Sequence, residues 1–167
     1  MKYEDTYVKL ADFGRELLNK KSLEEGLPLI SQYVKDVIKA ERCSIFIYNT
    51  SDKELWTTIS DGTDKISVPY NKGIVGHTIE VKKPIIENDP YSNPHFLKKI
   101  DQETGYVTKN LITAPIFNSQ RSIIGVLELL NKEGGFDKED SKFMIFFAHY
   151  ISGFLELTNL YLAQEKK

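Results

Sequence analysis

The sequence predicts an α+β domain in which a six-stranded antiparallel sheet carries long N- and C-terminal helices on one face. Both ends of the chain have apolar residues at helical spacing, whereas the middle has short runs of β-branched and aromatic residues joined by polar turns. These joins are typical of hairpins rather than crossovers, which favours antiparallel pairing. The 167 residues suit one domain, which we divide into N-terminal helices (1–40), a sheet region (41–136) and a C-terminal helix (137–164).

Two helices are expected at the start of the chain. One apolar stripe runs from Tyr3 to Leu17, and a second runs from Leu23 to about Ala40. Ser22 and Glu25 have the spacing of a capping box, which marks the start of the second helix.

From Arg42 onward the period of the apolar residues changes to that of strands. We expect strands at 43–49, 54–60, 65–68 and 84–87, with a short helix at 74–81. The segment from Asn88 to Asn110 is too long for a simple connection, so we interpret it as a lid with a short helix from Asn93 to Ile100. A hairpin with strands at 111–117 and 122–131 follows, and Asp137 can cap the final helix.

Glu128 does not fit the second strand of that hairpin, because its neighbours on both faces are apolar. A carboxylate in such a place costs roughly several kcal/mol of desolvation unless donors or a ligand surround it. Glu128 is therefore the first candidate for a functional residue. The alternative is that Lys109 or a threonine neutralises it within the protein.

Composition excludes several classes of function. The 22 basic and 24 acidic residues form no long run of one sign, which argues against nucleic acid as a partner. Residues 1–10 lack the apolar core of a signal peptide. Residues 143–162 have the length of a membrane span, but His149, Glu156 and Asn159 interrupt them. We expect a cytoplasmic protein without a membrane partner.

The sequence assigns no catalytic or metal-binding residue. Cys43 is the single cysteine, so no intrachain disulfide can form, and its strand setting predicts an inert core thiol. The three histidines are too far apart in sequence to have metal-ligand spacing. No Gly-x-Ser-x-Gly nucleophile elbow is present. We therefore expect a protein that is not an enzyme.

Several motifs between Glu41 and Gly153 together resemble those of a GAF domain. The motifs are Glu41-Arg42-Cys43-Ser44-Ile45-Phe46, Asp61-Gly62, Gly73-Ile74-Val75-Gly76-His77, Asn88-Asp89-Pro90-Tyr91, Asn93-Pro94-His95-Phe96 and the run from Gly125 to Lys132. Within the family they are most similar to the cyclic-nucleotide-binding kind found in mammalian phosphodiesterases and cyanobacterial adenylyl cyclases. The resemblance implies a GAF fold and a ligand pocket within residues 41–136.

The resemblance also implies individual roles. Ser44, Asp101, Thr104, Thr108 and Glu128 match pocket residues of the family by motif. Asp61 belongs to the matched Asp-Gly pair, and Ser60 stands where the phosphodiesterase pocket has an aromatic residue that stacks on the purine.

A further family signature supports the fold rather than contacting the nucleotide. It appears here as Asn131, Lys132, Phe136 and Asp140, with Ser141 in place of the last glutamate. The resemblance implies an ion pair between the lysine and the aspartate.

The residues themselves favour the same pocket. The N–H groups of Ile74 and Val75, at a helix start behind Gly73, suit an anion such as a cyclic phosphate. Thr104, Thr108 and Glu128 offer hydroxyls and a carboxylate for a ribose and a purine edge. Two structural alternatives stay open: Gly73 and Gly76 can serve a tight helix entry, and the threonines can cap a helix or turn.

These observations predict a regulatory module that binds a purine cyclic nucleotide, cAMP or cGMP, as a ligand rather than a cofactor, and passes the signal to an effector. The alternatives are a ligand-free GAF domain used for dimerisation and a GAF domain for a different small molecule.

A parallel homodimer through the terminal helices is also predicted. Apolar residues in the final helix follow a heptad seam: Phe143, Phe147, Tyr150, Phe154, Leu157 and Tyr161. A second stripe, with Met144, Ala148, Ile151, Leu155 and Leu162, is left to cover the sheet. The alternative is that the terminal helices of one chain pack on each other.

Overall fold

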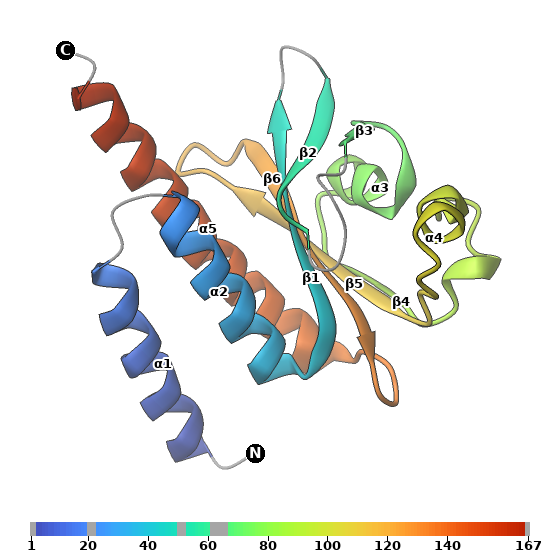
Figure 1. Cartoon of the computed structure of the whole chain (residues 1–167), viewed down its shortest axis with the longest axis horizontal. Coiled ribbons are helices and arrows are strands. Elements are labelled where there is room, and N and C mark those ends of the chain that lie inside the picture. Colours follow the sequence, from blue (N-terminus) through green and yellow to red (C-terminus); the bar gives the residue numbers. More distant parts are fainter. Residues whose placement is uncertain (1–2, 20–22, 50–52, 61–66, 166–167) are drawn as a thin grey trace.

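The computed structural model describes residues 3–19, 23–49, 53–60 and 67–165. They form three layers, with helices α2 and α5 on one face of a sheet and helix α3 and the lid (residues 88–110) on the other (Figure 1). The expected capping box at Ser22 lies outside the described residues.

The predicted six-stranded antiparallel sheet is confirmed. Its strand order is β3-β2-β1-β6-β5-β4, and every neighbouring pair is antiparallel. The strands are β1 (Ala40–Asn49), β2 (Glu54–Ser60), β3 (Ser67–Pro69), β4 (Ile85–Glu87), β5 (Leu111–Phe117) and β6 (Ile123–Lys132).

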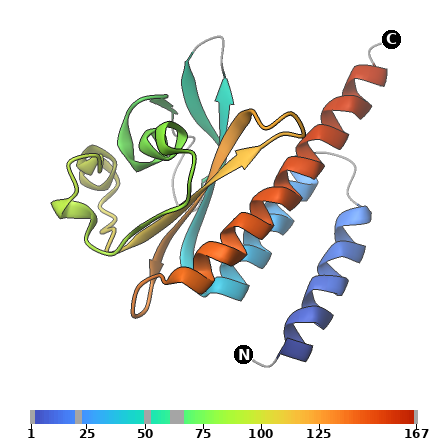
Figure 2. The same ribbon diagram turned by 180° about the vertical axis from the view of Figure 1, so that it is seen from behind.

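The long helices do not all lie on the sheet. Helices α2 (Leu23–Ile38) and α5 (Lys138–Glu165) cover its face, while α1 (Tyr3–Leu18) lies outside them (Figures 1 and 2). Phe13 of α1 stacks on Tyr33 of α2 at 4.4 Å between ring centroids and meets Tyr150 of α5 edge-on at 5.9 Å. The apolar stripe of α1 is therefore covered in part by helices, because α2 and α5 already occupy the sheet.

The core lies between the sheet and these helices. From β1, Cys43 and Ile45 point into it, and from β6 Leu127 and Leu129 join them. All four side chains are fully buried. Burial by α2 and α5 explains the apolar residues on this face, and a second buried cluster with Phe46 and Val126 explains those on the other face.

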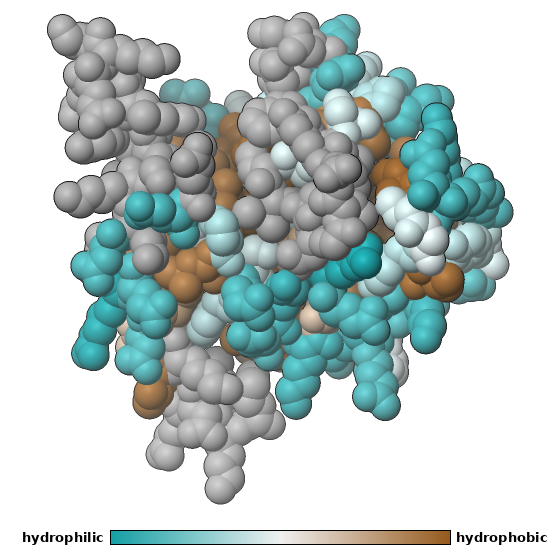
Figure 3. Space-filling model, viewed as in Figure 1, coloured by the Kyte–Doolittle hydropathy of each residue, from teal (hydrophilic) through white to brown (hydrophobic). Residues whose placement is uncertain are grey.

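The other face of the sheet carries a polar row. Ser44 lies opposite Glu128, and Glu128 lies opposite Thr113, so the three residues cross β1, β6 and β5 side by side. Helix α3 (Gly73–Val81) lies against Thr113, whose hydroxyl is hydrogen-bonded to that of Thr78 at 2.6 Å. In the space-filling view the visible surface is mainly hydrophilic, and hydrophobic side chains show both near α3 and α4 and near α1 and α2 (Figure 3).

The helix expected at 93–100 was wrongly placed. Within the lid, the structure has a 3-10 turn at Pro90–Ser92 and helix α4 at Lys98–Thr104. The side chain of Asn93 accepts the N–H of His95 at 2.8 Å, which holds residues 93–95 in a turn. The helix therefore begins only after that turn.

The segment between β6 and α5 is fixed by the predicted signature. Nζ of Lys132 lies 2.7 Å from Oδ1 of Asp140, which confirms the ion pair that the family resemblance implies. The N–H of Asp140 donates to Asp137 at 3.0 Å, so Asp137 caps α5 as predicted. Among the described residues, no helix is long and apolar enough to cross a membrane.

Candidate ligand-binding site

A cavity of about 70 Å³ lies between the polar face of the sheet, α3 and the lid. The predicted residues that line it are Ser44, Ile74, Val75, Asp101, Thr104, Thr108 and Glu128. Its remaining wall is mainly apolar, with Phe46, Val68, Phe96, Leu97, Ile100, Leu111 and Leu130. The cavity thus combines an apolar wall with a few polar groups, which is the usual composition of a small-molecule site.

Glu128 faces this cavity without a protein partner among the described residues. No hydrogen bond or ion pair joins its carboxyl group to another described side chain, so neither Lys109 nor a threonine neutralises it in this part of the chain. Burial, with the nearby charge of Asp101, raises the pKa of Glu128 to about 7. Near neutral pH the group can both donate and accept a hydrogen bond.

Asp101, in contrast to Glu128, is a carboxylate that accepts several hydrogen bonds from the protein. Tyr91 donates its hydroxyl at 2.6 Å, and Thr108 donates its N–H at 2.8 Å and its hydroxyl at 2.9 Å. The bond to Asp101 raises the pKa of Tyr91. Asp101 therefore braces the lid from within, which is a structural role beside any contact with a ligand.

The first residues of α3 also line the cavity. Lys72 at the N-cap position makes no side-chain cap bond, and the first intrahelical bond is donated by Gly76. The N–H groups of Gly73, Ile74 and Val75 have no acceptor among the described residues. A helix start with unsatisfied N–H groups attracts an anion.

The two predicted threonines make protein hydrogen bonds of their own. The hydroxyl of Thr104 donates to the carbonyl of Ile100 at 2.8 Å and accepts the N–H of Tyr106 at 3.3 Å. This is the capping role that the sequence left open. Both threonines use their hydroxyl protons in this way, but an oxygen can still accept from a ligand.

Arg42 also lines the cavity, beside Tyr106, and the sequence did not single out Arg42 as a site residue. The Arg42 guanidinium carbon lies 3.6 Å from the centroid of the Tyr106 ring. Tyr106 in turn donates to Glu41 at 2.8 Å, and burial raises its pKa. Arg42 stands two residues before Ser44 on β1, so the two side chains lie on the same face of the strand. This two-residue spacing was the signal in the sequence that could have identified Arg42 as a site residue.

Two predicted residues stay untested. Ser60 pairs with Ser44 across β1 and β2, which places its backbone beside the polar row. Its side chain and the whole of Asp61 lie outside the described residues. Their ligand contacts remain predictions.

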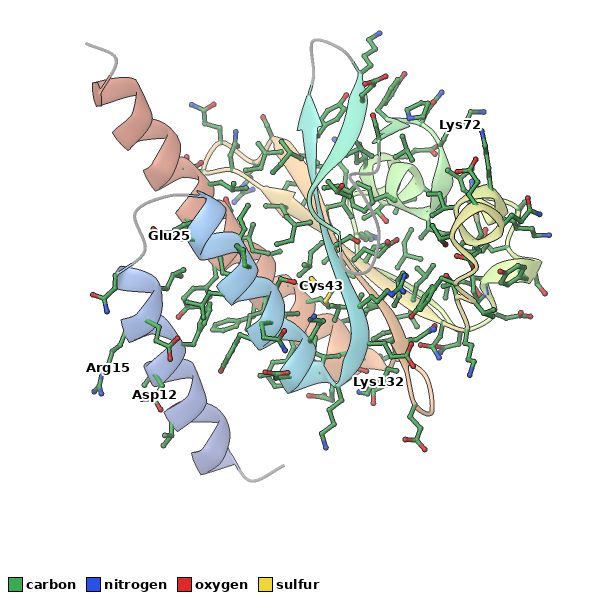
Figure 4. All side chains as sticks on the ribbon, viewed as in Figure 1. Asp12, Arg15, Glu25, Cys43, Lys72 and Lys132 are labelled. Carbon is green, nitrogen blue, oxygen red and sulfur yellow. The ribbon has the colours of Figure 1, made fainter. Side chains whose placement is uncertain are left out.

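Cys43 lies away from the cavity. Cys43 is buried on the opposite face of the sheet, between β1 and the helices (Figure 4). The described residues contain no group of three or more potential metal ligands.

The amino-acid sequence matches the family model of the GAF domain over residues 22–154. It is 29% identical over 151 residues to the dual 3',5'-cyclic-AMP and -GMP phosphodiesterase 11A of Takifugu rubripes, a match covering 81% of this chain and 17% of that protein.

Solved structures show the same fold. The GAF domain of a phosphoenolpyruvate-protein phosphotransferase from Coxiella burnetii superimposes with a TM-score of 0.85 at 19% identity, covering 98% of this chain and 99% of that one. Free methionine-R-sulfoxide reductase from Neisseria meningitidis, solved with its substrate, gives a TM-score of 0.77 at 16% identity, covering 90% and 88% of the two chains. With the family match extending over most of its length, the chain belongs to the GAF domain family.

Proposed function

We propose that the chain is a cytoplasmic regulatory module that binds a purine cyclic nucleotide, cAMP or cGMP, in the cavity beneath the lid. The observation that carries this proposal is that one cavity is lined both by the carboxyl group of Glu128 and by the start of α3, neither of which finds a hydrogen-bond partner among the described residues. A ligand that pairs with both groups needs an anionic group to accept from the N–H groups of α3 and hydrogen-bond donors for the carboxyl group of Glu128. A cyclic nucleotide has both, in its phosphate and in its ribose hydroxyl and base.

The size of the cavity implies that binding is coupled to lid opening. Pockets that enclose a small molecule measure roughly 300 Å³ or more, whereas this cavity measures about 70 Å³. The sheet is fixed by its ladders, and of the two remaining walls, α3 and the lid, we take the lid as the one that moves. Opening of the lid before binding would slow association.

The relative from Takifugu rubripes supports a cyclic nucleotide, because its name gives activity on both cAMP and cGMP. Its enzymatic activity does not transfer, since the match covers only 17% of that protein. The likeness to the sulfoxide reductase concerns the fold, and the one cysteine here points away from the cavity. A sensor rather than an enzyme is therefore the function we propose.

Titration calorimetry with each cyclic nucleotide tests the proposal. The unmodified chain should bind at least one of them, and Glu128→Gln, which keeps the shape of the side chain but cannot ionise, should change the affinity about tenfold or more. Glu133→Gln alters an exposed carboxylate and serves as the matched control.

The same titration separates the alternatives. Absence of heat with both nucleotides would refute the proposal. Binding of another small molecule, lost in Glu128→Gln, would then identify a GAF domain for that ligand, whereas no ligand together with a stable dimer would indicate a dimerisation module.

A further inference from the structure

The lid meets α3 along an apolar seam that includes two close pairs of residues. Leu97 of the lid lies over Gly73, where an added Cβ would stand 3.2 Å from Cδ1 of Leu97. His95 of the lid stacks on His77 of α3, with ring centroids 3.9 Å apart and planes inclined by 9°. Phe96 and Leu97, next to His95, line the cavity, so this seam closes it.

Hydrogen bonds also attach the lid to parts of the fold other than α3, and two of them lie near its start. Asn93 donates to Glu87 of β4 at 2.8 Å, and Asn88 donates to the carbonyl of Phe136 at 3.1 Å. Neither bond reaches α3. Separation of the lid from α3 therefore has to break the histidine stack and the contact with Leu97, while these two hydrogen bonds can stay intact.

We propose that the stack of His77 and His95 is a pH-sensitive latch that holds the lid against α3 and releases it when both rings carry protons. Histidine is the side chain whose charge ordinarily changes between pH 5 and 8. Two uncharged rings, or one charged and one uncharged, can stack in this geometry. Two positive charges at this separation repel, and moving the lid away relieves the repulsion.

The inference rests on the proposed function only in taking the cavity as a ligand site, because the latch acts without a ligand. Three carboxyl groups bear on it. Oε2 of Glu80 lies 3.4 Å from Nδ1 of His77 and is the one carboxylate that the described residues bring within ion-pair distance of either ring. Asp101 and Glu128 lie inside the cavity, and Glu128 titrates in the same pH range.

Hydrogen–deuterium exchange of the full chain, without ligand, tests the latch. Exchange of the amides of residues 88–110 is measured at pH 5.5 and 7.5 and corrected for the intrinsic effect of pH. The lid should open roughly fivefold more often at pH 5.5, as expected for two unit charges about 4 Å apart in high-dielectric surroundings. The measurements are repeated in Glu128→Gln, which removes the titration of the cavity carboxyl group.

Two substitutions of His95 separate charge from packing. His95→Phe keeps an aromatic face without a charge, so the lid should stay closed at both pH values. His95→Asn removes the ring, so the lid should open more at both pH values and respond little to pH. His149→Asn changes an exposed histidine of α5 outside the seam and should keep the full response.

The proposal is overturned if the unmodified chain opens equally at both pH values, or if His95→Phe retains the pH response. Because no nucleotide is present, either result is independent of whether cAMP or cGMP binds.

Discussion

The carboxyl group of Glu128 makes the stability of the fold depend on pH. Its pKa rises from an ordinary value of 4.5 to about 7 in the folded chain. Between these values the folded chain keeps a proton that the unfolded chain has released, so stability falls as pH rises through this window. The total loss is about 3 kcal/mol.

Glu128→Gln should remove this loss, because the amide does not ionise. We expect its free energy of unfolding to exceed that of the unmodified chain by up to about 3 kcal/mol at pH 8, with little difference at pH 4.5. Urea denaturation at several pH values measures this. The exposed Glu133→Gln should follow the unmodified curve, and parallel curves for all three proteins would contradict the prediction.

Ser60 should limit the affinity for a purine, since it replaces the aromatic residue of the family pocket. Ser60→Phe should tighten cyclic-nucleotide binding by roughly 1 to 3 kcal/mol, the range of a base stacked on an aromatic ring. Calorimetry compares it with Ser122→Phe, which places the same ring on an exposed turn. Equal effects of the two substitutions would show that stacking at position 60 is not involved.

Single residues differed in how well the sequence predicted them. Glu128 was predicted because burying a carboxylate in an apolar strand costs desolvation energy, and this cost can be recognised from the sequence alone. Arg42 was missed because an arginine near the start of a strand is usually solvent-exposed. Only the fold brings Tyr106, which lies beyond α4, over its guanidinium.

At the level of elements, the lid is joined to the segment that starts α5. The side chain of Asn131, at the end of β6, accepts the N–H of Lys109 at 2.7 Å and donates to the carbonyl of Val107 at 2.8 Å. Asn88 holds the other end of the lid to Phe136. Both ends of the lid are therefore tied to one short stretch before α5.

Asn131→Ala should cost roughly 2 kcal/mol, because it leaves several partly buried backbone groups without their hydrogen-bond partner. Asn131 also has a φ of +61°, which an alanine adopts only with strain. Asn131→Gly loses the same bonds without that strain, so it should be the less destabilised of the two. Urea denaturation gives both values, and equal losses would mean that strain contributes nothing.

Helices α2 and α5 approach closely at Gly26, where an added Cβ would overlap the ring of Phe154. Gly26→Ala should therefore destabilise the fold by roughly 1 to 3 kcal/mol, the usual effect of overpacking. Gly14→Ala is the matched control, since nothing lies within 4 Å of its added Cβ. It should be neutral or stabilising by up to about 1 kcal/mol in thermal or urea denaturation.

The sequence predicted most elements because their apolar periods are clear. Helix α4 was misplaced because the turn at Asn93 depends on a side-chain bond that periodicity does not reveal. The place of α1 was also beyond the sequence, since an apolar stripe does not say whether a sheet or other helices will cover it.

For the whole molecule, the homodimer stays a prediction, but its predicted seam changes. Phe147 and Phe154 are buried within the chain, and Phe143 and Tyr150 pack against the same core. The side chains of Leu157 and Tyr161 lie outside the described residues. The stripe assigned to the sheet is buried as expected at Met144, Ala148, Ile151 and Leu155.

On α5, Ile145 and Phe146 remain exposed, by 44% and 38%, and are the residues on which a dimer is now best tested. Phe146→Glu should shift the chain from dimer to monomer in sedimentation equilibrium, because a charge at an apolar interface is costly. Val107→Glu, at a site 59% exposed on the lid, should leave the mass unchanged. A concentration-independent monomer mass for the unmodified chain would refute the dimer.

Helix α5 also has a mechanical consequence. Its 28 residues make a rod about 42 Å long. It is pinned to the sheet region near its base by Asp140 and further along by Ser152 and Glu156, which bond Phe117 and Ser119. Its final turns project beyond the sheet (Figure 1). A rod held at two separate points resists tilting. A displacement of its base by the lid would therefore reach the C-terminal end as a rotation about the helix axis or as a shift along it.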